Sequence, residues 1–549
     1  MIPTATLHSD GAPDSTVSRE VVLCAVIAAG MSLFVLLVVP PGGDLAAHLY
    51  RTFLARRGDL VWDNLWFAGE YPLVSYSVLY YLAASLVGND VVAAVSIVLS
   101  VVLFASITLR EWGPSARWPI RSFALLAAGQ LFTAAYPFDA GIATLLATVW
   151  ALQRGRLSVA ICCAVLTLGF SPLAFLFLAI ALTALWLHRR HLNRRAVLVA
   201  TVLLAAGGAE FGLLAMFPSG RLLYPYGLWR LLAGLAVAGS SAAIALRAPR
   251  AYPLAMLFVV WAATSVVAYS IPSAIGHNIL RASTFVFPLT LLAGVIARFR
   301  PRWLAIPALI GSLAATVVPY LSMIPTRTST ATGTLSFWRP MLTYLRAHAT
   351  PSFRIEVVPT SNHWEAYFLP RTGYALARGW YRQLDIADNP ILYHSPLGPS
   401  EYRAWLRREG VEYVLLPLAP LEAIDATREA ALLRSGLSGL KDVWNGSDGR
   451  IYALPHPEPI LSGPGEATIT TLDSNRIVGQ VTRAGLYTLR VHYTPYWQVT
   501  KGSICIERGK STMTALEFAH AGTFSIRAVE SPADLLWSLI DSDHNHCSD

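Results

Sequence analysis

The chain has 549 residues, of which 54% are hydrophobic and only 14% carry a charge. An ordinary soluble domain carries roughly 25% charged residues, so this composition excludes a soluble enzyme. The net charge of +9 could suggest a nucleic-acid partner. However, the arginines cluster at the borders of apolar runs, which is typical of membrane proteins. Few of the basic residues are lysines and alanine is abundant, as in high-GC bacterial genomes, so we expect a bacterial membrane protein that binds no nucleic acid.

The first 324 residues predict a polytopic membrane domain. Residues 1–20 are polar and predict a disordered cytoplasmic tail, and the apolar run that follows lacks a convincing cleavage site, which predicts an uncleaved first span. Apolar runs then alternate with short arginine clusters, which should stay in the cytoplasm. The pattern predicts eleven spans, at 21–39, 91–109, 122–136, 140–153, 157–169, 172–187, 196–217, 228–246, 253–270, 282–297 and 303–324.

The first loop, 40–90, follows one span after a cytoplasmic N-terminal tail and is therefore expected outside the cytoplasmic membrane. An odd number of spans places the tail after residue 325 outside as well. Segment 74–87 is apolar, but a crossing there would reverse the side of every later arginine cluster, so we expect a juxtamembrane or half-inserted helix. Several spans between 140 and 187 are short for a hydrocarbon core of about 30 Å. Short helices tend to surround a cavity, so we expect the first six spans to carry the function.

The tail predicts two extracytoplasmic regions. Residues 325–456 mix a helical pattern at 400–409 with short strands at 354–359 and 411–417, which predicts an α+β or α/β domain. Residues 457–540 predict a β-sandwich-like domain with strands at 466–471, 485–493, 503–507 and 522–529, and 541–549 predict a disordered end. Of the five cysteines, only Cys505 and Cys547 could pair. The fold class is therefore an α-helical membrane protein of about eleven spans with a C-terminal α/β plus β-sandwich region.

The first outer loop carries the first group of candidate site residues. Asp44 follows a Pro-Pro-Gly-Gly break and opens a helical pattern that places Asp44, His48 and Arg51 on one polar face. Aspartate and histidine at i and i+4 can touch, so the imidazole could orient the carboxylate, or both could face one substrate or metal. In the alternative interpretation, Asp44 only caps the helix and His48 is an interfacial side chain.

Carboxylates and aromatic rings follow in the same loop. Rings stack on the CH-rich faces of sugars while carboxylates accept their hydroxyls, so the loop predicts a sugar site; an aromatic belt at the membrane surface would explain part of the pattern. The sugar-site candidates in this loop are Asp63, Trp66, Glu70 and Tyr71.

Two further groups of side chains could contact substrate. The dense segment 361–385 contains Trp364, Glu365, Trp380 and Arg382, which could contact an acceptor sugar or dock the tail onto the outer loops. A phosphate could be held by Arg51, His277 and Arg281. In the alternative interpretation, these side chains only extend to the polar membrane interface. No Gly-rich phosphate loop, dinucleotide fingerprint or zinc spacing occurs, which argues against a cytoplasmic nucleotide-sugar donor.

These residues also carry a resemblance. The stretches GGDLAAHLYR, WDNLWFAGEYP and SVLYYLAA resemble the GT-C superfamily of glycosyltransferases that use lipid-linked sugars. They are similar, more closely, to bacterial membrane proteins labelled as 6-pyruvoyl-tetrahydropterin-synthase-related. The resemblance covers about residues 20 to 190 well and the tail loosely.

The resemblance implies roles for two acids. By position, Asp44 would be the catalytic base or a metal ligand, and Asp139 the second acid, in the next outer loop. We expect both on one outer cavity, with His48 beside Asp44. The loop lacks a paired D-x-D or D-E, which puts metal dependence in doubt, so no metal site is assigned although a divalent metal remains possible. Ser-Tyr-Ser stands where relatives commonly have Pro-Pro-Leu.

The expected function is transfer of a sugar from a polyprenyl-phosphate-linked donor to a cell-envelope glycan or glycolipid, on the outer face of the cytoplasmic membrane. The expected partners are membrane lipid, the donor and the acceptor. The rival interpretation is a non-catalytic transporter or an assembly factor for envelope glycolipids.

Overall fold

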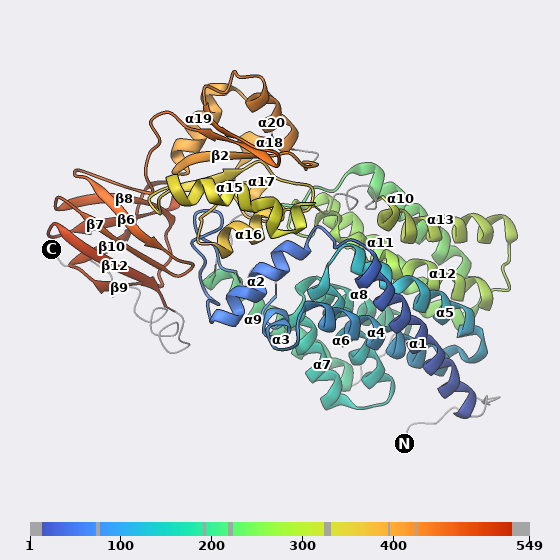
Figure 1. Ribbon diagram of the computed structural model, residues 1–549. Helices are drawn as coiled ribbons and strands as arrows, with labels where there is room; N and C mark the ends of the chain where they lie inside the picture. The colour runs from blue at the N-terminus through green and yellow to red at the C-terminus, as the bar shows by residue number, and fades with distance from the viewer. Residues whose placement is uncertain are drawn as a thin grey trace. The chain divides into compact units, whose positions relative to one another are not determined.

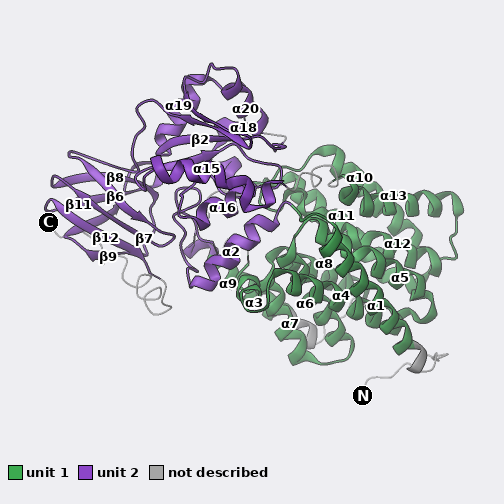
Figure 2. Cartoon of the chain, viewed as in Figure 1, with its two compact units in different colours: residues 1–42, 77–213, 223–325 green, residues 43–76, 214–222, 326–549 purple. Residues whose placement is uncertain are grey.

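The computed structural model describes residues 14–72, 77–189, 194–217, 223–322, 331–393, 396–422 and 425–529. The chain divides into two compact units (Figure 2). Unit 1 comprises residues 1–42, 77–213 and 223–325, and unit 2 comprises residues 43–76, 214–222 and 326–549. Most of the first outer loop, which the sequence analysis grouped with the membrane domain, therefore folds together with the tail.

Unit 1 is built of helices (Figure 1). They are α1 (Asp14–Val38), α3 (Tyr80–Val87), α4 (Asn89–Trp112), η1 (Gly113–Ala116), α5 (Arg117–Leu126), η2 (Ala127–Phe132), α6 (Tyr136–Gln153), α7 (Leu157–Phe170), α8 (Pro172–Arg189), α9 (Arg194–Met216, whose last residues belong to unit 2), α10 (Leu228–Ala245), η3 (Pro249–Ala251), α11 (Tyr252–Ser270), η4 (Gly276–Ala282), α12 (Ser283–Ile296) and α13 (Arg302–Leu321). Helix α4 packs against α1 and α6, α6 against α7, α10 against α11, and α12 against α13.

A helix occupies each predicted span, with α5 and η2 sharing the third. By length and composition, six helical segments of the described residues could cross a membrane: 17–38, 89–132, 228–245, 249–270, 276–296 and 302–321. The helical membrane character is thus supported, while the count of eleven crossings is not confirmed. Helix α3 has eight residues and is about 12 Å long, as expected for a segment that does not cross; residues 73–76 lie outside the described ranges.

Unit 1 exposes large apolar side chains on its surface. Val22, Leu37, Leu86, Leu204 and Phe211 are each more than 60% exposed. Large apolar patches on a soluble protein normally mark an interface. Here they are distributed over several helices, which fits contact with lipid.

Three arginine clusters that the sequence predicts to be cytoplasmic, at 110–121, 154–156 and 247–250, lie at one end of unit 1. The Glu20 carboxylate is 2.7 Å from Arg121 and 3.7 Å from Arg117. The indole N–H of Trp112 donates to the backbone carbonyl of Arg250 at 2.8 Å, and Gln153 donates to the carbonyl of Ile107 in the same region at 3.2 Å. The clusters therefore share one end, as the positive-inside pattern requires.

Unit 2 contains an α/β domain and a β-sandwich (Figure 1). The α/β domain has a four-stranded sheet in the order β1-β2-β4-β3, in which β1 and β2 are parallel and the other pairs antiparallel. Its elements are η5 (Ala331–Gly333), α15 (Leu335–His348), β1 (Arg354–Val357), α16 (Glu365–Arg371), α17 (Arg382–Asp388), α18 (Pro390–Tyr393), α19 (Pro399–Arg408), β2 (Val411–Pro417), α20 (Ala426–Arg434), β3 (Lys441–Asn445) and β4 (Gly449–Ala453).

The core of this domain includes the first outer loop. Helix α2 (Leu45–Arg57) contributes Tyr50 and Leu54, and Trp66 follows from the loop. These side chains are buried with Trp338 and Leu342 of α15. Burial of these large apolar groups holds the loop in unit 2.

The β-sandwich consists of two four-stranded sheets, in the orders β10-β11-β8-β5 and β6-β7-β12-β9. Alternate residues along β8 are buried, as in a strand with one face in a core. Phe518 and Phe524, from different sheets, have ring centroids 5.1 Å apart. The strands are β5 (Leu461–Ser462), β6 (Ala467–Leu472), β7 (Arg476–Val481), β8 (Gly485–His492), β9 (Trp497–Lys501), β10 (Ile504–Arg508), β11 (Met513–Phe518) and β12 (Gly522–Ala528).

The cysteines separate into two groups. Cys505 in β10 is disulfide-bonded, whereas Cys24, Cys162 and Cys163 of unit 1 are free. Cys547, the predicted partner of Cys505, and the predicted disordered end 541–549 lie outside the described residues.

Candidate functional site

The loop residues predicted to bind sugar lie in the interior of unit 2. Asp63 is fully buried and accepts the hydroxyl of Tyr50 with both carboxylate oxygens at 3.1 Å, and the backbone N–H of Leu65 at 3.1 Å. Burial, followed by the nearby charge of Glu70, raises the pKa of Asp63 well above its ordinary value. Its oxygens are thus occupied by contacts within the unit.

Arg51 and Glu70 form a buried ion pair 3.0 Å long. The Arg51 guanidinium also donates to the carbonyl of Pro72 at 2.9 Å and lies over the rings of Trp66 and Tyr381, at 5.8 and 5.5 Å. Burial raises the pKa of Glu70, and the charge of Arg51 partly offsets this rise. The ion pair lies within the first loop, and the contact of Arg51 with Tyr381 joins the loop to the tail.

The aromatic residues of the loop have inward-facing partners as well. The indole N–H of Trp66 donates to the carbonyl of Ala366 at 3.1 Å, and the hydroxyl of Tyr71 donates to Thr494 at 2.8 Å. Gly69 has a φ of +113°, and a Cβ there would lie 2.3 Å from the ring of Trp62. These contacts describe a packed loop rather than an open sugar cleft.

Asp44 and His48 occupy the start of α2. Asp44 stands at the N-cap position, but its side chain makes no capping hydrogen bond, so the capping interpretation is not supported. The backbone N–H of His48 donates to the Asp44 carbonyl at 3.2 Å, and the His48 side chain is buried. Asp44 and Asp139 belong to different units, so a shared cavity stays a prediction.

The tail segment forms a cluster around His363. The imidazole stacks on Trp380 with centroids 3.5 Å apart and lies between Glu365, at 3.2 Å from Nδ1, and Glu422, at 3.1 Å from Nε2. Arg382 pairs with Glu422 and covers Trp380. His363 has a φ of +51°, which is uncommon for a residue other than glycine and costs roughly 1–3 kcal/mol.

Trp364 and Glu365 are buried, and Trp380 and Arg382 are partly exposed. Glu365 accepts both the backbone N–H and the hydroxyl of Thr360, at 3.2 and 2.6 Å. Of the four residues predicted to contact acceptor, only Trp380 and Arg382 therefore offer surface.

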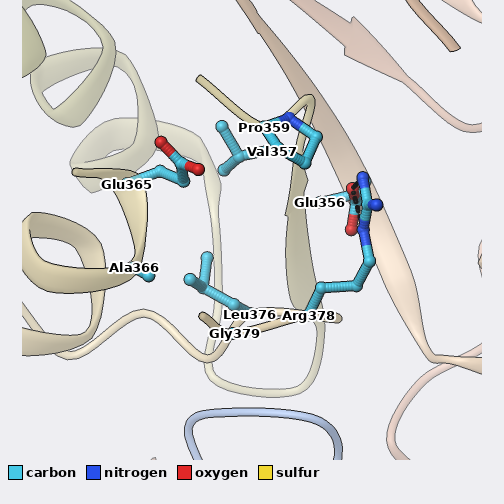
Figure 3. Close-up of a pocket in the computed structure, with 8 residues that line it drawn as sticks. All are labelled: Glu356, Val357, Pro359, Glu365, Ala366, Leu376, Arg378 and Gly379. Atoms are coloured by element: carbon cyan, nitrogen blue, oxygen red, sulfur yellow. Dashed lines mark hydrogen bonds and ion pairs between the residues drawn. The ribbon is translucent and has the colours of Figure 1, made fainter. Parts of the chain in front are cut away.

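Beside this cluster, Arg378 is surrounded by four buried carboxylates. Its guanidinium nitrogens lie 2.5 Å from Glu356, 2.6 Å from Asp425, 2.7 Å from Glu429 and 3.5 Å from Asp385. Burial lowers the pKa of Arg378, but the charges of the carboxylates outweigh burial and raise it. The cavity between Arg378 and Glu365 (Figure 3) is about 10 Å³ in volume, and about one water fits such a space. It cannot hold a sugar.

In unit 1, Asp139 lies in the first turn of α6 and is only 1% exposed. Neither carboxylate oxygen has a hydrogen-bond partner among the described residues. A buried carboxylate normally accepts several hydrogen bonds, and leaving it without them costs free energy. Two residues further along α6, Gly141 meets the start of α8: a Cβ at Gly141 would lie 2.6 Å from Ala174 and 2.9 Å from Ser171.

Arg281 and Tyr320 lie near Asp139. Arg281, in η4, is close enough to interact electrostatically with the Asp139 carboxylate, and its guanidinium lies 6.0 Å from the ring of Phe138. The hydroxyl of Tyr320, in α13, is within electrostatic range of both charged groups and is 2.6 Å from the hydroxyl of Thr284. We call Asp139, Arg281 and Tyr320 the Asp139 site.

His277 is engaged separately. Its Nδ1 is 2.8 Å from the carbonyl of Pro225, and its ring stacks on Tyr224 with centroids 4.2 Å apart. It lies four residues before Arg281 in η4.

The sequence analysis did not single out Tyr320, and it assigned no individual role to His363 or Arg378 within the dense segment 361–385. Tyr320 ends an apolar span, where an interfacial tyrosine is expected anyway. Nothing in the sequence around Arg378 indicates that acids from β1, from α17 and from the start of α20 converge on it. Only the left-handed backbone of His363 is distinctive, and it cannot be read from sequence.

Within the described ranges, no group of three or more His, Cys, Asp or Glu side chains is arranged to hold a metal ion. Comparison with known proteins adds no identity: no family model matches the chain, and no curated protein matches it significantly.

Proposed function

We propose that the chain is a membrane glycosyltransferase, which transfers a sugar from a polyprenyl-phosphate-linked donor to a cell-envelope glycan or glycolipid on the outer face of the bacterial cytoplasmic membrane. The observation that carries this proposal is the Asp139 site. A buried carboxylate without hydrogen bonds is costly to maintain, and such groups concentrate at functional sites. Arg281 provides a cation of the kind that a phosphate requires.

The chemistry follows from these two charges. The Asp139 carboxylate takes the proton of the acceptor hydroxyl as its oxygen forms a bond to the anomeric carbon of the donor. The bond from the anomeric carbon to the phosphate oxygen breaks, and the phosphate leaves with the electron pair. Arg281 stabilises the charge of the departing phosphate. A carboxylate that is shielded from water is a stronger base than an exposed one, so the burial of Asp139 suits this role.

The other predicted site residues have a smaller part in the proposed function. Asp44 and His48 remain candidates for a second catalytic pair, while Trp380 and Arg382 are the candidates for acceptor contact because they offer surface. Asp63, Trp66, Glu70 and Tyr71 stay predicted sugar contacts, and the contacts described for them lie within unit 2.

The proposed location rests on two observations. The shared end of three arginine clusters supports a cytoplasmic side for that end. The disulfide of Cys505 supports an oxidising compartment for the tail.

The test is glycolipid analysis of a deletion strain complemented with single variants. Asp139→Asn keeps the size of the side chain but cannot take the proton, so we expect glycan synthesis to fall about 10²–10⁴-fold. Arg281→Gln should impair it too. Asp90→Asn, at an exposed carboxylate of unit 1, is the matched control and should retain activity.

If an Asp139→Asn protein, expressed and folded at the wild-type level, made normal amounts of glycan, Asp139 would not be the catalytic base. If Asp44→Asn also retained activity, the chain would be assigned to the non-catalytic alternative, a transporter or an assembly factor.

A further inference from the structure

A second group of charges lies at the arginine-rich end of unit 1. Arg110 is in the last turn of α4, and Arg154 and Arg156 follow the end of α6. The guanidinium carbons of Arg154 and Arg156 lie 4.3 and 5.4 Å from the ring of Trp150. Arg110 and Arg156 are both close enough to Arg154 for their positive charges to act on it.

No ion pair in the described part of the chain includes Arg110, Arg154 or Arg156. The Nη1 group of Arg154 is buried and has no hydrogen-bond partner there. Arg117 and Arg121 at the same end differ, because Glu20 pairs with both.

Mutual repulsion and an unsatisfied buried donor both favour a bound anion. A phosphate offers several oxygens at once, and the planar fork of a guanidinium matches them. Trp150 adds an aromatic ring of the kind that resides at the headgroup level of a bilayer.

The surroundings favour a lipid over a free phosphate. Helix α7 begins directly after Arg156 and exposes Val159 and Val165, which are 41% and 49% accessible. Apolar surface that can contact an acyl chain therefore adjoins the charged groups. We propose that Arg110, Arg154 and Arg156 bind the phosphate of an anionic phospholipid. This inference does not depend on the proposed transferase activity.

The experiment is native mass spectrometry of the full chain in detergent, titrated with phosphatidylglycerol, with zwitterionic phosphatidylcholine or with inorganic phosphate as competitor. We expect retention of phosphatidylglycerol and little of phosphatidylcholine. Arg110→Gln removes an exposed charge and should weaken binding about fivefold. Arg154→Gln also removes hydrogen bonds to the phosphate and should weaken it about tenfold or more. Arg247→Gln is the matched control, since it removes an exposed arginine near the same end, and should bind normally.

Three results would overturn the proposal. The first is wild-type binding of phosphatidylglycerol by both Arg110→Gln and Arg154→Gln. The second is an equal loss in Arg247→Gln, which would mean a general surface charge. The third is displacement of the lipid by millimolar inorganic phosphate, which would identify the ligand as soluble phosphate. Because Arg110 is exposed, its variant keeps the test valid if Arg154→Gln does not fold.

Discussion

Replacing Arg378 by methionine should destabilise unit 2 strongly. The guanidinium is the cation among four buried carboxylates, three of which lie within 2.7 Å of its nitrogens. Methionine has a similar volume but no charge, so the change leaves the carboxylates in the interior without compensation. Breaking a buried ion pair by removing one partner costs about 3–5 kcal/mol. For a domain of this size about 1 kcal/mol corresponds to roughly 2–4 °C, so we expect the unfolding midpoint to fall by roughly 6–20 °C.

The pH dependence of this loss follows from the carboxyl groups. Burial raises the pKa of Glu356, Asp385 and Glu429, and Arg378 opposes that rise in each. Without the arginine the pKa of each group rises further, so the folded protein holds protons that the unfolded chain releases. A folded state that binds more protons loses stability as pH rises. The deficit of Arg378→Met should therefore be smaller at pH 5 than at pH 8.

The assay is thermal unfolding of the full chain in detergent at both pH values. Arg371→Met is the matched control, because Arg371 is exposed, lies over the rings of Tyr367 and Phe53, and donates a hydrogen bond to the Tyr367 hydroxyl. The unfolding midpoint of this variant should change little. Adding Glu356→Gln and Glu429→Gln to Arg378→Met should restore much of the loss, since these groups are coupled. An Arg378→Met midpoint within 2 °C of wild type, at both pH values, would refute the reasoning.

Three further predictions concern other parts of the chain. Gly141→Val should abolish correct packing of α6 on α8, because even a Cβ would lie 2.6 Å from Ala174; Gly212→Val, at a position with open space, should be tolerated, and equal expression of the two monodisperse proteins would contradict this. Burial, with the charge of Asp385, raises the pKa of Asp388 to about 7. Ionisation of Asp388 therefore destabilises the folded protein above the unfolded-state pKa near 3.8, and the destabilisation grows until about pH 7. Asp388→Asn should raise the unfolding midpoint at pH 8 and leave it unchanged at pH 3, and a lower midpoint at pH 8 would contradict this prediction. A cysteine at Leu437, which is 70% exposed, should react with a membrane-impermeant maleimide in intact cells in a variant without other accessible thiols; labelling only after permeabilisation would place unit 2 in the cytoplasm.

Much of the secondary structure could be predicted from local pattern. Strand β2 coincides with the predicted 411–417, and α19 with 400–409 to within a residue, because alternation and helical periodicity are properties of neighbouring residues. Membership of the units could not be predicted in this way. Trp66 and Tyr71 look like an aromatic belt in sequence. Their partners Ala366 and Thr494 are 300 and 423 residues away, and no local signal records such a contact.

For the candidate sites too, residue types could be predicted from sequence but tertiary contacts could not. Asp139 and Arg281 were named from sequence because an acid after a Pro-containing break and an arginine beside an apolar span are visible in the chain. That Asp139 is buried without hydrogen bonds depends on how the helices of unit 1 pack around it, which the local sequence does not record. Composition predicts a sugar role for Asp63 and Glu70 as well, but their contacts with Tyr50 and Arg51 could not be read from composition.

The intertwining of the first loop with the tail affects how the protein is made. Asp59 is held by Ser474 at 2.6 Å across 415 residues of sequence, and Trp66 by Ala366 across 300. At a synthesis rate of about 5–20 residues per second, these partners emerge from the ribosome roughly 15–80 s after the loop. During that interval the loop has its tryptophans and tyrosines but not the side chains that cover them. A period of this length favours shelter of the nascent loop by a chaperone or by the membrane surface, and it makes completion of unit 2 one of the last steps of biogenesis.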